Sequence, residues 1–346
     1  MTDVARLAGV SQKTVSRVIN GERYVSDNIR QRVLRAAQQL GYRRNTAARA
    51  LITGRFRRIG FVSLGTADYG PASLLIALER ATRAAGFSFT VATTLEGGHD
   101  KISDAIRWLL EQGIDGIVIS EPVDEGEKLE IDPGVPVLSF GKLPGLSGSH
   151  VVFGGADGVA AARTATEHLL ELGHDTVWHL AGPQRWWAAR DRREGWRRAL
   201  DDAGATPPPL AEGDWSPASG YKAGTALASD PSMTAVFVAN DEMAIGMIRA
   251  LNEAGRAVPD DVSVIGFDDI PSAAYLSPPL TTMRQDFEAV AAHGLDLLIQ
   301  QIEGTSAEPD SKPLRTDFPA DLIVRQSAAA PSHDRRNDAP SRKEVQ

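Results

Sequence analysis

Apolar residues recur at helical spacing from the start of the chain. Val4, Leu7 and Ala8 stand at positions i, i+3 and i+4, which places them on one face of a helix. Gly9 follows and ends this helix, because glycine readily adopts the positive φ that a tight turn requires. The pattern therefore predicts a short first helix with one buried face.

A second helix is predicted directly after this turn, over residues 12–19. Ser11 stands where an N-cap belongs, since its hydroxyl can accept a hydrogen bond from an unpaired amide. The apolar face of the helix carries Val15, Val18 and Ile19, and the polar face carries Gln12, Lys13, Ser16 and Arg17. Two short helices joined by a glycine-bearing turn are typical of a helix-turn-helix. Gln, Lys and Arg near the start of its second helix can reach base edges in a major groove.

A third helix is predicted over residues 26–40, with Ser26 as its N-cap and Gly41 at its end. Its apolar face consists of Ile29, Val33, Leu34, Ala37 and Leu40. These three helices make residues 1–42 an all-α domain. The next helix-favouring stretch, residues 45–51, is too short to be stable alone. We expect it to become ordered only when something holds it, and the alternative is a charged linker over 43–56.

The pattern changes at Ile59, where apolar, strand-like runs begin to alternate with amphipathic helical stretches. The runs are IGFVSL, FTVATT, GIVIS, VPVLSF, TVWHLAG, TAVFVAN and DVSVIGFDD. The intervening helices are predicted at 71–85, 102–112, 159–172, 188–203, 220–228, 242–254 and 288–303. This alternation predicts an α/β fold with parallel sheets. Because residues 57–326 exceed one usual sheet, we expect two doubly wound lobes, as in periplasmic binding proteins, with a cleft between them.

The last stretch, residues 327–346, is rich in Ala, Pro, Ser and charged residues and has no apolar period. This composition predicts a disordered tail. The tail contains no leucine heptads, so it offers no coiled-coil device for a tetramer. We therefore expect a dimer.

The charges divide the chain close to the point where the pattern changes. Residues 1–58 carry 13 basic and 3 acidic side chains, a net charge of +10, whereas the remainder carries 24 basic and 42 acidic ones, a net charge of −18. A basic module joined to an acidic body is typical of a nucleic-acid-binding domain attached to another function. The alternative, a small helical bundle with a merely solvated polar face, does not explain this separation.

Composition and missing motifs narrow the function further. The 346-residue chain contains no cysteine, which excludes disulfides and thiolate zinc sites and fits a reducing cytosol. It shows no signal-peptide pattern and no apolar run of the roughly 20 residues that a membrane span requires, so we expect a cytoplasmic protein. No nucleotide-binding, hydrolase or metalloprotease motif is present, and no pattern pairs two carboxylates for glycoside hydrolysis. The sequence predicts neither an enzyme nor a metal or cofactor site, and His99, His168, His174 and His179 are expected to be structural.

Ligand-binding residues are expected just after the strands, because open α/β sheets bind ligands beyond the carboxyl ends of their strands. Carboxylates, an amide and a guanidinium can bind the hydroxyls of a sugar there, and Trp offers a flat apolar face. We therefore interpret Arg192, Asn240 and Asp268 as ligand contacts. The other candidates in these loops are Asp68, Tyr69, Asp157, Trp186, Trp187 and Trp215.

Several neighbouring residues are given structural roles instead. Asp241 is expected to cap the helix predicted from Glu242, because carboxylates favour helix starts. Trp196 lies on an amphipathic helix and is expected in the core. Trp186 and Trp187 are adjacent in the sequence, so we expect only one of them to face the cleft.

Seven stretches together resemble the lactose-repressor (LacI/GalR) family of bacterial transcription regulators. They are DVARLAGVSQKTVSRVING, NTAARAL, TEHLLELGH, GDWSPASGY, VFVANDEMAIG, VSVIGFDD and PPLTTMRQDF, and the likeness extends to about Arg325. The resemblance implies that the second helix reads the major groove through Gln12, Lys13 and Arg17, with phosphate contacts by Ser11, Thr14, Ser16 and Asn20. It also implies a hinge helix over 45–51 that folds on the operator, with contacts from Asn45 and Ala48 and with Leu51 wedged into the central base step.

The same resemblance implies a homodimer on a near-palindromic operator, regulated by an effector bound between the lobes. The family's effector contacts fall on Asp157, Arg192, Trp215, Asn240 and Asp268, with Phe287 nearby and with Tyr69 and Trp187 setting ligand preference. YGPAS and GDWSPASGY resemble members that respond to β-linked galactosides or glucosides, so we expect such a sugar to release the operator. The alternative is a co-repressor system in which a purine or a phosphorylated sugar tightens DNA binding.

Two positions depart from the family pattern. Only Met1 and Thr2 precede Asp3, so either the natural start lies upstream or the first helix is capped less well. Gly158 follows Asp157 at a position where Asn is common in the family.

Overall fold

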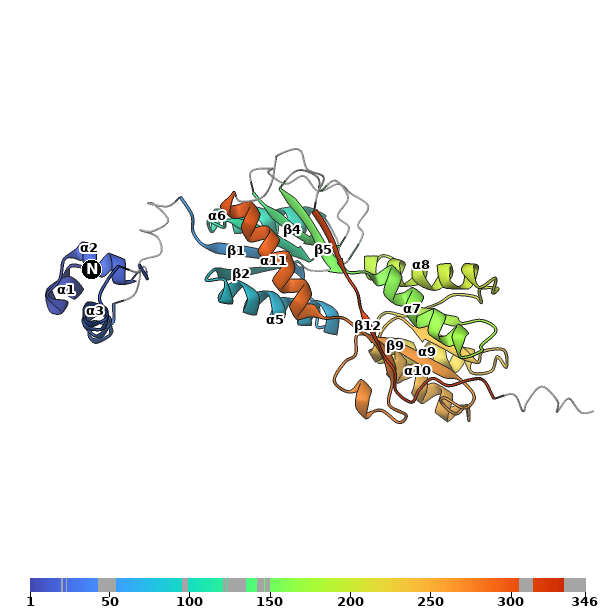
Figure 1. The fold of residues 1–346 in the computed structure, drawn as a ribbon. Coiled ribbons are helices and arrows are strands. Elements are labelled where there is room, and N and C mark those ends of the chain that lie inside the picture. The colour runs from blue at the N-terminus through green and yellow to red at the C-terminus, as the bar shows by residue number, and fades with distance from the viewer. Residues whose placement is uncertain are drawn as a thin grey trace, which may run out of the picture. The chain divides into compact units, whose positions relative to one another are not determined.

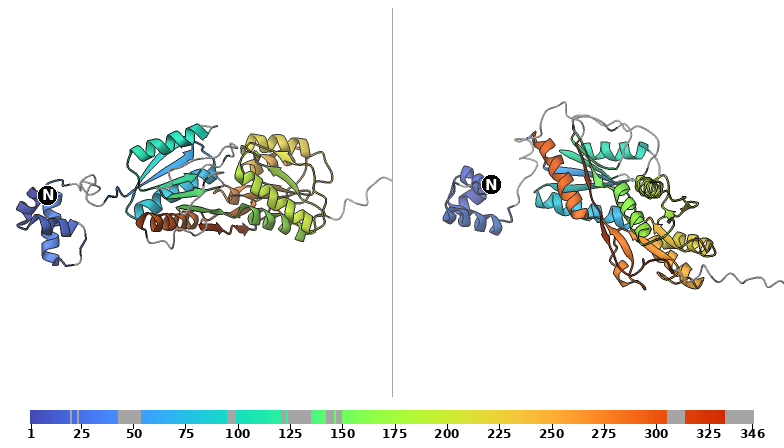
Figure 2. Two further views of the ribbon diagram at one scale, coloured as in Figure 1. Left: turned by 90° about the horizontal axis from the view of Figure 1, so that it is seen from above. Right: turned by 45° about the vertical axis from the view of Figure 1, so that its right-hand side comes forward.

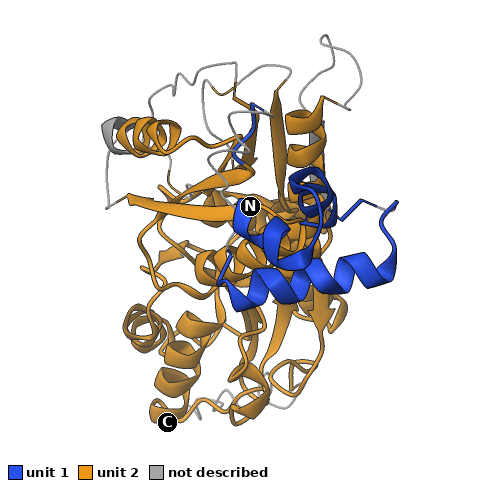
Figure 3. Cartoon of the chain, turned by 90° about the vertical axis from the view of Figure 1, so that its left-hand side faces the viewer, with its two compact units in different colours: residues 1–56 blue, residues 57–346 orange. Residues whose placement is uncertain are grey.

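The computed structural model describes residues 1–19, 21–22, 24–42, 54–94, 99–120, 123, 135–141, 146, 150–304 and 314–332. The chain divides into two compact units, Met1–Phe56 and Arg57–Gln346 (Figure 3). Each unit buries its own hydrophobic residues. The fold therefore separates the basic start of the chain from the acidic body.

The N-terminal unit contains three short helices, α1 (Thr2–Ala8), α2 (Gln12–Ile19) and α3 (Asp27–Gln39). Gly9 ends α1 with a φ of 61°, and a Cβ there would lie 2.8 Å from the Arg32 guanidinium. That guanidinium donates a hydrogen bond to the Ala8 carbonyl at 2.5 Å, which ties α3 to the end of α1. The core is built from small side chains: Val4, Ala5, Ala8, Val15, Val18, Val33, Ala36 and Ala37.

Three leucines that were predicted to be buried are exposed instead. Leu7, Leu34 and Leu40 are 53%, 50% and 47% exposed. Ala5 and Ala36 take inward positions, so the buried stripe of each helix is rotated away from the leucines. The predicted capping role of Ser26 is also wrong, because Ser26 occupies the N-cap of α3 but its hydroxyl makes no capping bond. Asp27 places the favourable negative charge in that first turn.

The second unit is built on two six-stranded sheets. The first has the order β11-β5-β4-β3-β1-β2, and the second has the order β12-β10-β9-β8-β6-β7. The first sheet contains β1 (Arg58–Leu64), β2 (Ser88–Thr94), β3 (Gly116–Ser120), β4 (Val137–Phe140), β5 (Val151–Ala156) and β11 (Leu314–Phe318). The second contains β6 (Trp178–Ala181), β7 (Ala211–Glu212), β8 (Ala235–Val238), β9 (Ser263–Phe267), β10 (Thr281–Arg284) and β12 (Asp321–Ile323). Paired strands are parallel except for β10 and β12, which confirms the predicted α/β class.

Helices cover both faces of each sheet (Figure 2). In the first lobe, α5 (Tyr69–Ala84) and α11 (Phe287–Glu303) pack on one face and α6 (His99–Glu111) on the other. Phe61 belongs to the cluster under α5 and α11, while its neighbour Val62 belongs to the cluster under α6. This alternation is the period of two that a strand buried on both faces requires.

The second lobe has the same layering. Its helices are α7 (Gly158–Glu171), α8 (Trp187–Asp202), α9 (Pro217–Leu227) and α10 (Asp241–Glu253), followed by the short 3₁₀ helix η1 (Ala273–Tyr275). Phe237 packs with α7 and α8, whereas its neighbour Val238 packs with α10. Trp196 is buried on α8 and donates its indole N–H to the Val177 carbonyl, so its predicted core position is confirmed.

The chain passes between the two sheets at three described connections (Figure 1). The first connection joins β5 to α7, the second joins β10 to α11, and the third joins β11 to β12. Each lobe is therefore completed by a late part of the chain. Such a two-lobed arrangement places the carboxyl ends of both sheets along one cleft.

The predicted disorder from residue 327 onward is wrong for residues 327–332. Ser327 is fully buried, donates to the Val264 carbonyl at 2.6 Å and accepts from the Thr281 amide at 2.8 Å. Ala329 exchanges two hydrogen bonds with the Ser263 hydroxyl. These polar partners hold the segment without the apolar period on which the prediction relied. Residues 333–346 lie outside the described part of the chain.

Candidate nucleic-acid interface and ligand cleft

Helix α2 presents a continuous polar face to solvent. Val15 and Val18 are buried against the other two helices, which fixes the rotation of α2. Ser11 accepts a hydrogen bond from the Thr14 amide at 3.1 Å, so its capping role is confirmed. The side chains that remain exposed or half-buried on this face are Ser11, Gln12, Lys13, Thr14, Ser16 and Arg17.

Two of these side chains have weak partners within the unit. The Gln12 amide donates to the Thr2 hydroxyl at 2.9 Å, and the Arg17 guanidinium lies 3.5 Å from the Glu22 carboxylate. Both side chains of the Arg17–Glu22 pair are nearly half exposed, so solvent screens the interaction and a phosphate or base can replace it at little cost. Asn20, Asn45, Ala48 and Leu51, including the expected hinge helix, lie outside the described residues.

A cleft of about 210 Å³ lies between the two lobes of the second unit. Its walls are the loops that leave the carboxyl ends of the strands in both sheets. Nine residues proposed from the sequence line it: Asp68, Tyr69, Trp186, Trp187, Arg192, Trp215, Asn240, Asp268 and Phe287. Asp157 is not among the lining residues, because its carboxylate caps α7 by accepting from the Ala160 amide at 2.9 Å. The strand-end rule therefore located the cleft from sequence.

A buried ion pair forms the polar centre of the cleft. The Arg192 guanidinium lies 3.4 Å from the Asp268 carboxylate and 3.7 Å above the centre of the Phe267 ring. It also donates to the Ala239 carbonyl. Burial raises the pKa of Asp268, and the charge of Arg192 opposes this shift. Burial likewise lowers the pKa of Arg192, with Asp268 opposing.

Aromatic side chains form the apolar walls of the cleft. The rings of Trp186 and Trp215 pack edge to face with their centroids 5.6 Å apart. The rings of Tyr69 and Phe287 pack in the same way with their centroids 6.2 Å apart. Trp186 and Trp187 both line the cleft, so the expectation that only one would face it is wrong. Trp186 has an extended backbone directly before α8, and Trp187 is the first residue of that helix.

Three buried N–H donors at the cleft have no hydrogen-bond partner among the described residues. They are the indole nitrogens of Trp187 and Trp215 and the Nε of Arg192. A buried donor without an acceptor costs about 1–3 kcal/mol. The three side chains that carry these donors all line the cleft. A ligand with several acceptor oxygens, such as a polyhydroxylated molecule, suits a cleft with such donors.

The helix-capping role expected of Asp241 is taken by Asn240. Asn240 caps α10 by accepting from the Met243 amide at 3.0 Å, and its amide donates to the Trp215 carbonyl at 3.0 Å. Asp241 is fully buried and instead accepts from the Ile270 amide and the Thr282 hydroxyl. The predicted cap at Asp241 is wrong because the helix begins one residue earlier than expected. Asn240 still lines the cleft and orients Trp215.

Gln285 is a polar lining residue that the sequence analysis missed. Its amide donates to the Asp268 carboxylate at 2.8 Å. It follows β10, a strand that was not predicted, so the strand-end rule did not reach it. The sequence PPLTTMRQDF contains a pattern that could have identified Gln285. The residue stands between the run that ends β10 at Arg284 and the N-cap of α11 at Asp286.

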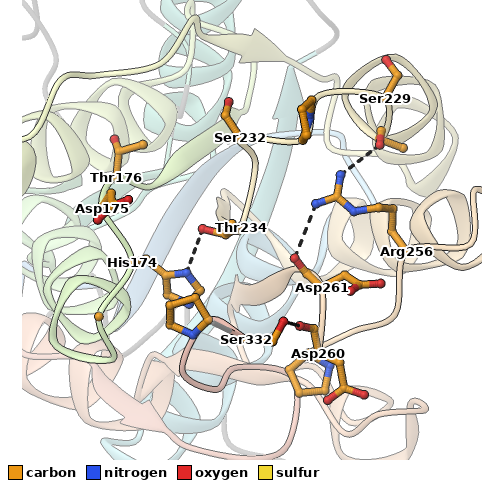
Figure 4. Close-up of a pocket in the computed structure, with 15 residues that line it drawn as sticks. His174, Asp175, Thr176, Ser229, Ser232, Thr234, Arg256, Asp260, Asp261 and Ser332 are labelled. Atoms are coloured by element: carbon orange, nitrogen blue, oxygen red, sulfur yellow. Dashed lines mark hydrogen bonds between the residues drawn. The ribbon is translucent and has the colours of Figure 1, made fainter. Parts of the chain in front are cut away.

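A second cavity, of about 550 Å³, lies at the opposite ends of β6, β8 and β9 (Figure 4). Although it is larger than the cleft, its cationic groups already serve the fold. Arg256 donates to the carbonyls of Ala228, Asp230 and Met233. His174 bonds the Thr234 and Ser263 hydroxyls and the Ala329 carbonyl. His174 thus holds the last described segment, which confirms a structural role for it.

Within the described ranges, no helix is long and apolar enough to cross a bilayer. In the same part of the chain, no three His, Cys, Asp or Glu side chains gather closely enough to hold a metal ion. His179 is buried and donates from Nδ1 to the Phe237 carbonyl at 2.8 Å, so the structure confirms a structural role for this histidine.

Comparisons with known proteins agree with the two-part structure. Residues 1–45 match the bacterial regulatory proteins, lacI family, and residues 166–328 match the periplasmic binding protein-like domain. The chain is 32% identical over 334 residues to the lactose operon repressor of Escherichia coli (strain K12), covering 95% of this chain and 91% of that protein. The chain therefore belongs to the LacI family of bacterial regulatory proteins.

Solved structures show the same likeness. A lac repressor dimer bound to operator and the anti-inducer ONPF matches with a TM-score of 0.78 and 30% identity, covering 95% of this chain and 98% of that one. A complex of the transcriptional regulator CelR with cellobiose matches with a TM-score of 0.68 and 32% identity, covering 94% and 98%. Both likenesses extend over the DNA-binding and the two-lobed parts of the chain.

Proposed function

We propose that this protein is a transcriptional repressor that leaves its operator when a sugar binds between the lobes. The observation that carries this proposal is the cleft of about 210 Å³, which is lined by a buried ion pair, by aromatic side chains and by three residues whose N–H donors lack a partner among the described residues. Polyhydroxylated rings match this combination, because their hydroxyls accept hydrogen bonds and their C–H faces pack on indoles.

Operator recognition is assigned to the exposed face of α2. Gln12, Lys13 and Arg17 are the base-reading candidates, since Gln pairs with adenine and Lys or Arg with guanine. Ser11, Thr14 and Ser16 are the phosphate contacts, together with Asn20 from beyond the described part. In a homodimer, two such helices meet two half-sites of a near-palindromic operator. The hinge contacts of Asn45, Ala48 and Leu51 complete the proposal.

The effector is proposed to be a β-linked galactoside or glucoside. The relative CelR is known in a complex with cellobiose, and the lactose repressor shares 32% of its residues with this chain. In the cleft, Arg192 and Asp268 bind ring hydroxyls, while Trp187 and Trp215 add donors and stacking surface. Tyr69 and Phe287 close the cleft from the first lobe. Asp157 contributes indirectly, by capping the helix whose first residue, Gly158, lines the cleft.

The three connections between the lobes provide the route from effector to operator. A ligand that bridges residues of both sheets stabilises one relative position of the lobes. The first lobe directly follows the DNA-binding unit in the chain, so a change in its position alters how two hinges can meet the operator. The protein acts in the cytoplasm, where operator DNA is found, and it binds the sugar without converting it.

Intrinsic tryptophan fluorescence tests the ligand part of this proposal. Because Trp186, Trp187 and Trp215 line the cleft, lactose, cellobiose or their methyl β-glycosides should change the emission in a saturable manner. Ligand that remains chemically unchanged after incubation supports a regulator, and hydrolysis would support an enzyme. Saturable binding by purines or phosphorylated sugars alone would favour the co-repressor alternative.

A further inference from the structure

Asp241 is a buried carboxylate that does not line the cleft. It is fully buried at the start of α10, and its two oxygens accept from the Thr282 hydroxyl at 2.6 Å and from the Ile270 amide at 2.9 Å. Burying a carboxylate is costly unless it is well hydrogen-bonded. The two bonds connect α10 to β10 and to the loop that follows β9.

The loop held by Asp241 has an unusual backbone. Asp268 and Asp269 have φ values of 108° and 51°, a region that residues other than glycine rarely adopt. Two consecutive residues in this region persist only when surrounding groups fix them. Ile270, the next residue, is fixed directly by Asp241. The Asp269 amide points to the Thr282 hydroxyl at 3.4 Å, and that hydroxyl in turn donates to Asp241.

The space under the loop fits the Asp241 carboxylate closely. A Cβ at Gly266 of β9 would lie 2.1 Å from the Asp241 Oδ1 atom. Because Gly266 has no side chain, the carboxylate of Asp241 can lie against the backbone of β9 and reach the loop that follows this strand. On the other side of the same loop, Asp268 faces Arg192 and Gln285 in the cleft.

We propose that Asp241 is a positioning residue of the effector site, which holds the strained turn at Asp268 and Asp269 and so aims Asp268 at the ligand. This inference rests on the proposed effector site. Burial raises the pKa of Asp241 to about 8, and the neighbouring Asp268 and Asp269 act in the same direction, while the bonds from Thr282 and Ile270 oppose it. The raised pKa favours the protonated carboxyl, in which the bond to Thr282 is reversed: Oδ1 carries the proton and donates to the Thr282 hydroxyl, while Oδ2 accepts from the Ile270 amide. An amide can imitate that form.

Four variants test the proposal, with lactose and cellobiose as probes and tryptophan fluorescence as the readout. Asp241→Ala removes both acceptors, and Thr282→Val removes the hydroxyl at constant shape. Both should raise the sugar dissociation constant at least tenfold, while operator affinity without sugar stays within twofold. Asp241→Asn should stay within about threefold of the parent, because its oxygen can accept from Ile270 and its amide can donate to Thr282. Thr166→Val is the matched control, since it removes an equally buried hydroxyl that bonds only within α7.

Parent-like sugar affinity in both Asp241→Ala and Thr282→Val would overturn the proposal, as would an Asp241→Asn variant as weak as Asp241→Ala. If Asp241→Ala does not fold, Thr282→Val decides the outcome. Amide hydrogen exchange over 268–270, without any ligand, separates this proposal from the proposed function. Faster exchange in Thr282→Val supports the held turn even if the parent binds neither sugar, and unchanged exchange contradicts it.

Discussion

The guanidinium of Arg192 and the carboxylate of Asp268 form an ion pair with an N–O distance of 3.4 Å, and each side chain is only 8% exposed. The pair comes from two different elements, α8 and the loop after β9. Its geometry is loose for an ion pair, and Arg192 Nε has no partner in the described part of the chain. A ligand hydroxyl can insert here, because it can donate to Asp268 and accept from Arg192.

Replacing Asp268 by Ala is expected to abolish the response at sugar concentrations that release the parent, but to keep operator binding. The variant loses a charge-assisted hydrogen bond of about 1.5–3 kcal/mol and leaves Arg192 without its counter-charge. Sugar affinity should fall about 10- to 100-fold, measured by fluorescence titration. Asp268 lies in the second lobe, outside the DNA-binding unit, so operator affinity without sugar should match the parent. Normal release of the variant by sugar would refute the assignment of this site.

Replacing Trp187 by Phe should weaken sugar binding by about 1 kcal/mol, because an aromatic ring remains but the indole N–H, which has no partner among the described residues, is removed. Trp178→Phe is a matched control, since the Trp178 indole N–H is also buried and lacks a described partner but does not line the cleft. The control should bind sugar as the parent does. Equal affinities for Trp187→Phe and the parent would mean that this N–H does not meet the ligand.

Replacing Gln12 by Ala should weaken operator binding by about 1–3 kcal/mol and relax the preference at one base pair. Gln39→Ala, at an exposed position near the end of α3, is the control and should leave both affinity and preference unchanged. Anisotropy titrations at fixed salt against a set of single-base operator variants measure both quantities. A uniform loss across all base substitutions would show that Gln12 contacts the backbone rather than a base.

The proposed hinge helix depends most on Leu51, the residue that the family resemblance places in the central base step of the operator. Leu51→Ala should weaken operator binding while leaving sugar affinity nearly intact, because a smaller side chain cannot wedge into the base step. The same anisotropy and fluorescence titrations measure the two affinities. An operator affinity equal to that of the parent would remove the hinge assignment.

The buried His179 is expected to make the stability of the second lobe depend on pH. Burial lowers its pKa to about 4, and the charges of Arg192 and Arg193 act in the same direction, while the hydrogen bond to the Phe237 carbonyl opposes. The folded state therefore keeps His179 neutral as pH falls below 6.5, whereas the unfolded chain takes up a proton. Stability that is present above pH 6.5 is lost progressively between pH 6.5 and about 4.

A His179→Phe variant isolates this contribution. Its free energy of unfolding should fall less between pH 7 and 4 than that of the parent, by about 3 kcal/mol. Denaturant unfolding at a series of pH values gives the difference, from which titrations common to both proteins cancel. Parallel pH profiles for parent and variant would contradict a buried neutral His179.

The layered fold could be predicted because its central strands are continuous apolar runs. IGFVSL and TAVFVAN are buried on both faces, so their composition alone distinguishes them from surface strands. Strands β5 and β10 were missed, since β5 contains two consecutive glycines and β10 is largely polar in sequence. Strands β11 and β12 come from the end of the chain. They could not be predicted from local sequence, because they form only by pairing with β5 and β10.

Individual site residues could be predicted only where strand position decides their role. Arg192 and Asp268 follow strands and meet in the cleft, as expected. Asn240 and Asp241 are adjacent, and either side chain could cap α10. The sequence alone does not show that the Asn240 amide caps the helix while the Asp241 carboxylate is buried. Residues 327–332 are ordered by distant partners such as Ser263 and His174, which local composition does not reveal.

In the proposed mechanism, a sugar in the cleft controls operator binding. The most direct measurement is fluorescence anisotropy of DNA from upstream of the protein's own gene, bound at fixed salt and titrated with lactose, cellobiose and related β-glycosides. We expect a saturable fall in anisotropy for the parent protein, and no fall for Asp268→Ala at the sugar concentrations that release the parent. Tighter DNA binding with a ligand, or release of both proteins alike, would contradict it.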